Sequence, residues 1–291
     1  MATYKGLDVS YSQGNIDFKK VKADGYTFVI IQAGYGRLAS QKDKYFEQNY
    51  KNAKAAGLNV GAYWFSYAES AEDAKSEAKA CMEVIKGKKF EYPIFFDLEG
   101  APLQKGKAEC SKMINNFCTA LQNNGWYVGL YMSRSALQTL VTDTVARKYT
   151  KWIAEYGVNK PQYEGSYGMW QYSDKGQVKG ITNNVDLDTA YKDYANIIKA
   201  GGYNGFKKPT LKTLDATGYK KGQATIGVLA FKQLLIAAKA KKIITQGVNN
   251  DNKFGDGTQK AVNELLGKWG YRQNGIAGEN MIKKLGELLK K

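Results

Sequence analysis

Histidine is absent from this sequence of 291 residues. Its absence excludes Ser-His-Asp and Cys-His catalysis, and every zinc site with an imidazole ligand. The three cysteines, Cys81, Cys110 and Cys118, are too few for an all-cysteine zinc site, and their odd number argues against a disulfide-built fold. We expect three buried thiols, no metal and no cofactor. Any chemistry must therefore come from carboxylates, tyrosines or lysines.

Long apolar runs are also missing. No stretch approaches the length that crosses a membrane, so no membrane insertion is expected. The first residues, MATYKGLDVS, are strand-like at once and contain no basic stretch followed by an apolar core. A secretory signal needs both features. We therefore expect a protein made in the cytoplasm without a signal peptide.

Acidic residues are scarce in the last third of the chain. Residues 207–291 have a net charge of +11, whereas residues 1–206 have a net charge of only +5. Such a basic segment predicts a polyanionic partner, which could be nucleic acid, an anionic membrane or a bacterial wall that carries phosphate polymers.

Short apolar segments alternate with amphipathic ones over the first two hundred residues. The expected strands are 5–10, 28–34, 59–68, 92–99, 126–133, 149–156, 167–173 and 184–191, and the expected helices are 16–24, 43–56, 70–86, 107–124 and 134–147. After about residue 150 the helical spacers shrink to loops. This order predicts an α/β fold, an irregular TIM-like (β/α) barrel with helices missing in its last third.

The segment AGGYNGFKKPT breaks this pattern with glycines and a proline, and it is typical of a linker. We assign residues 1–200 to the barrel, 201–210 to the linker and 211–291 to a small all-α C-terminal domain. Helices are expected in that domain near 224–241, 258–268 and 279–290.

The run YPIFFDLEG, residues 92–100, places two acids at the end of an apolar strand. Residues i and i+2 of a strand point to the same face, so Asp97 and Glu99 are expected side by side where the strand leaves the core. Two carboxyl groups in such a place are what cleavage of a glycosidic bond requires. Taken alone, the pair could also be a metal site or a solvated rim.

In barrels of this type the site lies at the C-terminal ends of the strands. The acids, amides and rings near those ends include Asp8, Tyr63, Tyr131, Trp152, Trp170, Gln171, Asp186 and Asp188. Aromatic rings stack on the apolar faces of sugars, and carboxylates bind their hydroxyls. The convergence of these side chains on one mouth predicts a carbohydrate ligand, although several of the rings could instead belong to the core.

Four motifs occur in order within residues 4–195, namely DVSYSQGNIDF, DLE, WQYSDKGQVKGI and NVDLD. Together they resemble glycoside hydrolase family 25, the Chalaropsis-type lysozymes, which are muramidases common in bacteriophage endolysins and bacterial autolysins. The tail resembles a helical peptidoglycan-binding domain through FGDGTQKAV and GIAGENMIKKL.

The resemblance implies cleavage of the β-1,4 bond between N-acetylmuramic acid and N-acetylglucosamine in peptidoglycan. It further implies a phage endolysin that reaches Gram-positive walls through holin- or lysis-mediated release. The basic tail would then bind anionic wall polymers rather than nucleic acid.

Carried over by motif, Glu99 is the expected general acid/base and Asp97 its partner, with Asp8 and Asp186 in the same acidic cup. Close and buried acids raise one another's pKa, and we assign the raised pKa to Glu99 and ionised character to Asp97 and Asp8. The expected substrate contacts are Tyr63, Tyr131, Trp152, Trp170, Gln171 and Asp188.

Two points stay open at this stage. Asp97 could attack the sugar directly, or it could orient the substrate's 2-acetamido group as the nucleophile; the likeness of the pair to that of substrate-assisted chitinases favours the second route. The alternative functions are a chitinase-like glycosidase and a non-catalytic wall- or nucleic-acid-binding protein. Phe95 argues against the chitinase, because those enzymes carry a further acid at that position.

Overall fold

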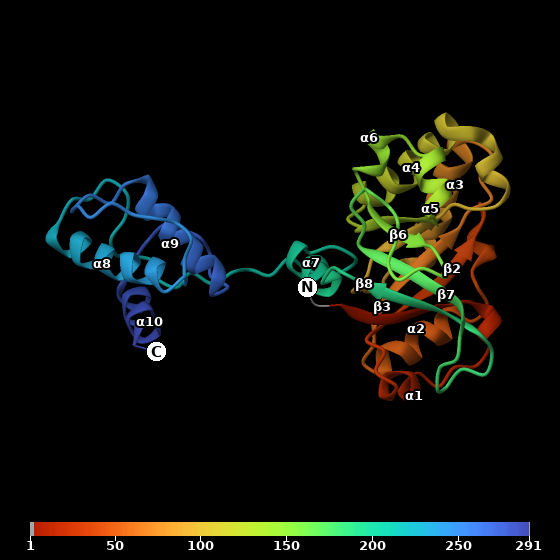
Figure 1. Cartoon of the computed structure of the whole chain (residues 1–291), viewed down its shortest axis with the longest axis horizontal. Helices are drawn as coiled ribbons and strands as arrows, with labels where there is room; N and C mark the ends of the chain where they lie inside the picture. The colour runs from red at the N-terminus through yellow and green to blue at the C-terminus, as the bar shows by residue number, and fades with distance from the viewer. Residues whose placement is uncertain (1–2, 291) are drawn as a thin grey trace. The chain divides into compact units, whose positions relative to one another are not determined.

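The computed structural model describes residues 3–290, which form two compact units divided after Pro209 (Figure 1). The first unit holds all the strands of the sheet, and the second is built from helices. The fold class expected from the sequence, an α/β barrel followed by a small all-α domain, is confirmed.

Eight strands close into a barrel in which each strand pairs with its neighbours in chain order. They are β1 Tyr4–Val9, β2 Phe28–Tyr35, β3 Asn59–Phe65, β4 Ile94–Asp97, β5 Val128–Ser133, β6 Thr150–Ala154, β7 Met169–Gly176 and β8 Val185–Ala190. The pairs from β1 to β7 are parallel, whereas β8 runs antiparallel to both β7 and β1. The open end of the barrel therefore combines the C-terminal ends of seven strands with the N-terminal end of β8.

The barrel has two apolar layers because strand side chains alternate between its faces. Phe95 and Trp152 pack inside the barrel, whereas Phe96 faces outward and stacks on Phe117 of α4 at a centroid distance of 4.2 Å. The covering helices are α1 Phe18–Ala23, α2 Phe46–Ala55, α3 Ala71–Ile85, α4 Gly106–Asn123, α5 Arg134–Leu140 and α6 Asp143–Ala146. The three cysteines are buried and unpaired, as expected.

No helix connects β6 to β7 or β7 to β8, so the irregular last third of the barrel is confirmed. One helix was not predicted, α7 Tyr194–Gly201, which follows β8. Its Tyr194 and Ile198 are fully buried with residues from the starts of the strands, such as Phe28. The helix therefore covers the N-terminal end of the barrel, opposite the end where the predicted acids lie.

The first half of the expected linker belongs to the barrel. Asn204 is fully buried, and its amide donates to the carbonyls of Phe90 and Tyr92 at 3.2 and 2.9 Å, while its Oδ1 accepts from the amide of Tyr127 at 2.7 Å. These contacts satisfy polar groups that would otherwise be buried without partners. Sequence composition does not reveal such long-range contacts, so the glycine-rich segment was interpreted as a linker. The compact unit ends at Pro209.

The second unit contains α8 Ile226–Ala240, α9 Asp256–Lys268 and α10 Glu279–Leu289. It has a hydrophobic core of its own, which includes Phe231, Leu265 and Met281. Across residues 3–290, the structure contains no helix that is both long enough and apolar enough to span a membrane.

Candidate active site

The strand with the DLE motif brings its first acid into the barrel. Phe95 and Asp97 of β4 point inward, while Phe96 and Leu98 belong to the outer layer. Asp97 is paired in register with Tyr131 of β5 and is only 5% exposed. The strand ends at Asp97, so Glu99 follows it rather than continuing it, and Glu99 is half-buried. Glu99 is consequently the more accessible member of the pair.

The other predicted acids meet across the antiparallel pair β1–β8. Asp8 lies opposite Asp186 in the register, and Gly6, which has no side chain, lies opposite Asp188. Asp186 and Asp188 are two residues apart on β8 and so share its inner face. Asp8 and Asp188 are buried, whereas Asp186 is half-exposed. The barrel mouth thus presents two accessible carboxyl groups, on Glu99 and Asp186, above three buried ones.

A hydrogen-bond network holds the buried acids in place. Gln171 donates from Nε2 to Oδ2 of Asp8 at 2.8 Å, and its Oε1 accepts from the hydroxyls of Tyr131 and Tyr156 at 2.8 and 2.6 Å. The indole of Trp152 donates to Oδ1 of Asp188 at 2.7 Å. Since both ends of the Gln171 amide are used, its orientation and the position of Asp8 are fixed together.

Burial raises the pKa of every acid in this group. Burial, and then the charge of Glu99, raise the pKa of Asp97 well above its usual value. Burial and the charge of Asp186 raise the pKa of Glu99. Burial, followed by the charges of Asp188 and Asp186, raises the pKa of Asp8 well above its usual value, while burial and Asp174 raise that of Asp186 to about 6.

Burial therefore opposes the ionised character expected of Asp97 and Asp8. Strand-end spacing suggested water on one side of each carboxyl group, but Asp97 and Asp8 are 5% and 6% exposed. Oδ1 of Asp97 is moreover buried with no hydrogen-bond partner in the described chain, a situation that favours the neutral acid. What distinguishes Glu99 is its accessibility rather than a uniquely raised pKa.

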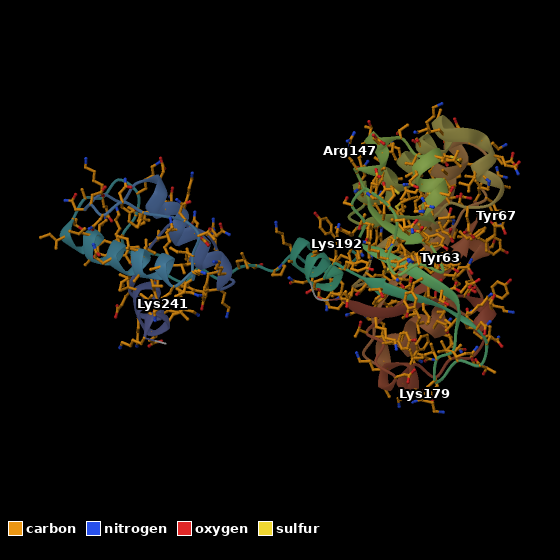
Figure 2. All side chains as sticks on the ribbon, in the orientation of Figure 1. Tyr63, Tyr67, Arg147, Lys179, Lys192 and Lys241 are labelled. Carbon is orange, nitrogen blue, oxygen red and sulfur yellow. The ribbon has the colours of Figure 1, made fainter. Side chains whose placement is uncertain are left out.

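The predicted aromatic contacts separate into two groups. Tyr63 is half-buried, and after burial itself, Asp8, Asp97, Asp186 and Asp43 raise its pKa, so its ring lies among the acids. Figure 2 marks Tyr63, with Tyr67 further towards the outer edge of the barrel unit.

The tryptophans differ from Tyr63. Trp152 is only 2% exposed and packs against Tyr131, Phe95 and Tyr63, so it has no free face on which a sugar could stack. Trp170 is 8% exposed and donates its indole N–H to the carbonyl of Glu155 at 2.8 Å. Asp188 and Gln171 are equally enclosed. These residues enclose the acids from the sides, and their contact with substrate stays a prediction.

Three exposed rings lie near the mouth: Tyr11, Tyr35 and Tyr67 are 55%, 39% and 59% exposed. Sequence reasoning placed Tyr67 at the end of its strand but not among the substrate contacts, and it missed Tyr11 and Tyr35. Each of the three lies at or just beyond the C-terminal end of a strand, β1, β2 and β3 respectively. That position was the available signal. Asp43, which accepts from the amides of Tyr11 and Tyr45 at 2.8 Å each, was also missed, because its segment carries no strand pattern.

Among residues 3–290, no group of three or more Cys, Asp or Glu side chains has an arrangement that could hold a metal ion. One end of this closed barrel carries accessible carboxyl groups of raised pKa beside exposed tyrosines. This combination is typical of glycosidases with a barrel fold.

The chain belongs to the glycosyl hydrolases family 25, whose sequence model matches residues 7–181. An autolytic lysozyme of Clostridium acetobutylicum is 34% identical over 198 residues, which are 68% of this chain and 58% of that protein. Lysozyme M1 of Streptomyces globisporus is 28% identical over 203 residues, 62% of this chain and 66% of the relative. The chain thus spans under two thirds of both relatives.

Solved structures agree with the fold. The autolysin LytC of Streptococcus pneumoniae, in complex with a synthetic peptidoglycan ligand, aligns with a TM-score of 0.57 at 30% identity, over 65% of this chain and 47% of LytC. A lysozyme of Streptomyces coelicolor aligns with a TM-score of 0.58 at 26% identity, over 69% of this chain and 98% of that one. The CTP1L endolysin, 23% identical, shares the fold over 99% of both chains with a TM-score of 0.63.

Proposed function

We propose that this protein is a peptidoglycan hydrolase that cleaves the β-1,4 bond between N-acetylmuramic acid and N-acetylglucosamine. The observation that carries the proposal is Glu99, an accessible carboxyl group of raised pKa at the mouth of a family 25 barrel. A glycosidic oxygen leaves only when it receives a proton, so a carboxyl group that keeps its proton near neutral pH is the required acid.

In this mechanism Glu99 protonates the leaving oxygen and then, as a carboxylate, removes a proton from the attacking water. Asp97, next to it on β4, stabilises the positive charge that develops at the anomeric carbon. It does so either by attacking that carbon itself or by holding the N–H of the substrate's 2-acetamido group, whose oxygen then attacks. The likeness of the pair to that of substrate-assisted chitinases favours the second route.

The remaining acids have supporting roles in the proposal. Asp186, half-exposed opposite Asp8, faces the substrate, and its charge helps to raise the pKa of Glu99. Asp8 accepts a hydrogen bond from Gln171 of β7, and it interacts electrostatically with Asp186 and Asp188 of β8. Tyr63 supplies the ring beside the acids, while Tyr131, Trp152, Trp170 and Asp188 keep this arrangement rigid.

The chemical test is mass spectrometry of peptidoglycan digested with the protein. New reducing ends on muramic acid support the proposal, whereas new reducing ends on glucosamine identify a glucosaminidase instead. Chitin oligosaccharides serve as the comparison substrate, because Phe95 is fully buried inside the barrel where the chitinase alternative needs a further acid. Turnover of chitin equal to that of peptidoglycan would favour that alternative.

We further propose that the second unit binds anionic wall polymers and that the protein acts as an endolysin. Two features support this proposal: the net charge of +11 over residues 207–291, and the likeness to the catalytic domain of endolysin ply40 from a Listeria phage, 27% identical with a TM-score of 0.55 over 68% of this chain. Synthesis in the cytoplasm and release at lysis stay predictions.

Deleting residues 210–291 is expected to leave turnover of soluble glycan fragments unchanged but to lower the rate on whole walls by about tenfold, because the tail raises the local concentration of enzyme at the wall. The loss should shrink at high salt, since exposed charges are screened there. Rates of wall clearing and fragment hydrolysis measure both effects.

The end point of the deletion provides its control. A chain that ends at Pro209 keeps Asn204 and its contacts to Phe90, Tyr92 and Tyr127, whereas one that ends at residue 202 loses them and should melt at a lower temperature. Equal rates on walls with and without the tail would refute the targeting role. Competition of full-length wall binding by DNA but not by wall polymers would indicate a nucleic-acid partner.

A further inference from the structure

A groove of about 570 Å³ lies at the barrel mouth and is not used by the mechanism above. It is lined by Tyr11, Gln32, Tyr35, Lys42, Asp43, Lys44, Phe65 and Tyr67. These residues come from the ends of β1, β2 and β3 and from the segment that precedes α2.

The groove adjoins the acidic cup. Gln32 is paired in register with Tyr63, and Phe65 is paired with Asp97. The hydroxyl of Tyr63 lies between the two sites. Burial raises its pKa, as do the acids of the cup, Asp8, Asp97 and Asp186, and Asp43 of the groove. The groove is therefore contiguous with the acidic cup that holds Asp97.

The walls of the groove are suited to sugars. Tyr35 and Tyr67 meet edge to face at a centroid distance of 5.8 Å, and Phe65 packs against Tyr67 at 5.2 Å. Gln32, which also lines the groove, is 8% exposed. Its side-chain amide offers both a donor and an acceptor to a ligand.

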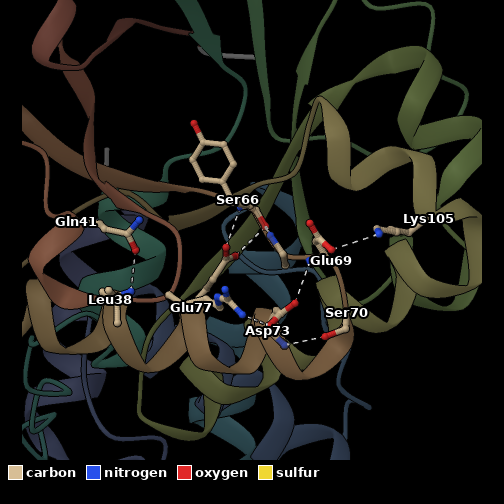
Figure 3. A network of polar contacts seen from close by, with 11 residues as sticks. Leu38, Gln41, Ser66, Glu69, Ser70, Asp73, Glu77 and Lys105 are labelled. Carbon is tan, nitrogen blue, oxygen red and sulfur yellow. Dashed lines mark hydrogen bonds and ion pairs between the residues drawn. The ribbon is translucent and has the colours of Figure 1, made fainter.

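The loop that carries Tyr67 is fixed from below. Glu77 of α3 is fully buried and accepts from the hydroxyl of Ser66 at 2.7 Å and from the amide of Tyr67 at 2.8 Å (Figure 3). The helix start is fixed as well, because Ser70 caps it by accepting from the amide of Asp73 at 3.1 Å. The aromatic wall is thus preorganised, which lowers the entropy cost of binding.

The two lysines of the groove differ in how they are paired. Lys42 forms an ion pair with Glu47 at 3.2 Å. The ammonium group of the exposed Lys44 lies over the rings of Tyr11 and Tyr45, 5.3 and 5.7 Å from their centroids, and has no ion-pair partner within residues 3–290. Lys44 therefore places a positive charge beside an aromatic surface, where it also acts on the neighbouring carboxyl group of Asp43.

We propose that this groove is a specificity subsite for the anionic substituent of muramic acid, in which the tyrosines hold the sugar and Lys44 pairs with a carboxylate. That carboxylate belongs either to the lactyl ether of the sugar or to the peptide attached to it. This inference rests on the proposed function. It explains how the protein distinguishes peptidoglycan from chitin, since the two glycans share the acetamido sugar ring and differ in the carboxyl-bearing group.

Lys44→Gln tests the proposal by titration calorimetry in the full-length Glu99→Gln background, so that no substrate is consumed. The probes are soluble glycan strands that retain their peptides, the same strands stripped of peptide so that the lactyl carboxylate is free, and neutral chitin oligosaccharides of equal length. Lys51→Gln is the matched control, because Lys51 is an exposed lysine on α2 outside the groove.

Lys44→Gln is expected to weaken binding of the carboxyl-bearing strands by about fivefold, the scale of an exposed ion pair, and to leave chitin binding unchanged. A loss only on the stripped strands assigns the lactyl carboxylate, and a loss only where the peptide is retained assigns a carboxylate of the peptide. A loss on both shows that Lys44 pairs with either carboxylate. The loss should fade at high salt. Lys51→Gln should change none of the affinities.

Two results would overturn the inference: unchanged affinity for both carboxyl-bearing strands, or an equal loss on the neutral oligosaccharide. Either result leaves the proposed function intact if the unmodified protein still produces reducing ends on muramic acid. Absence of those ends, with the Lys44 effect present, would instead contradict the function and retain the anion subsite.

Discussion

Replacing Glu99 with glutamine is expected to lower kcat on peptidoglycan by about 10³-fold, because general acid catalysis contributes roughly 10²- to 10⁴-fold and a neutral amide cannot supply the proton. KM should change little, since the amide keeps the size and polarity of the side chain. The measurement is steady-state release of reducing ends from soluble glycan strands, which isolates chemistry from attachment to the wall.

Folding should survive this change. Burial and the charge of Asp186 disfavour the ionised form of Glu99, so an uncharged amide removes a source of strain, and the melting temperature should stay the same or rise. Glu83→Gln is the matched control, an exposed glutamate on α3 that should retain full activity. Residual activity of Glu99→Gln within tenfold of the unmodified protein would place the acid elsewhere, and Asp186 would be the next residue to replace.

The barrel is expected to be more stable near pH 5 than near pH 8. Burial raises the pKa of Glu77 from its usual 4.5 to about 7, and burial also raises those of Asp8, Asp97 and Asp188. Between the unfolded and folded pKa values the folded state binds more protons than the unfolded state, so the free energy of unfolding falls as pH rises. For Glu77 alone this window is about 4.5 to 7, and the loss amounts to about 3 kcal/mol.

Differential scanning calorimetry at a series of pH values measures this slope and separates the two units. Glu77→Gln should flatten the dependence of the barrel between pH 5 and 7, because the titrating group is gone. The second unit should not show this slope. Burial of Glu264 raises the pKa of that residue, but hydrogen bonds from Lys268 and from the amides of Gln246 and Thr245 outweigh burial and lower the pKa to about 2. A barrel transition that keeps its slope in Glu77→Gln would contradict the assignment.

The strands were predictable because the signal for them is local. A buried strand of this barrel is an apolar run of a few residues bounded by turn residues, and the run before Asp97 shows it directly. The acids at the strand ends followed from the strands, because the side-chain period of two and the parallel order fix where each end lies.

Burial within the site was not predictable, because it depends on contacts far apart in the chain. Trp152 at a strand end could face the mouth or the interior, and only its bond to Asp188, 36 residues away, places it inside. Asn204 was taken for linker because its partners lie 77 to 114 residues away. The raised pKa values of Asp97 and Asp8 depend on the same long-range enclosure.

The reversed direction of β8 has a consequence for how such a barrel can diversify. The connection from β7 to β8 turns at the open end, and it is tied to the turn after β1, because Asn183 donates to the carbonyl of Ser12 at 2.8 Å and Gln13 donates to that of Asn184 at 3.1 Å. This hairpin loop can be lengthened or exchanged without a helix having to be repacked on the outer layer. Substitutions and insertions in the rim beside Asp186 should therefore disturb the packing of the barrel least. This rim is where we expect changes that alter which bacterial wall is recognised.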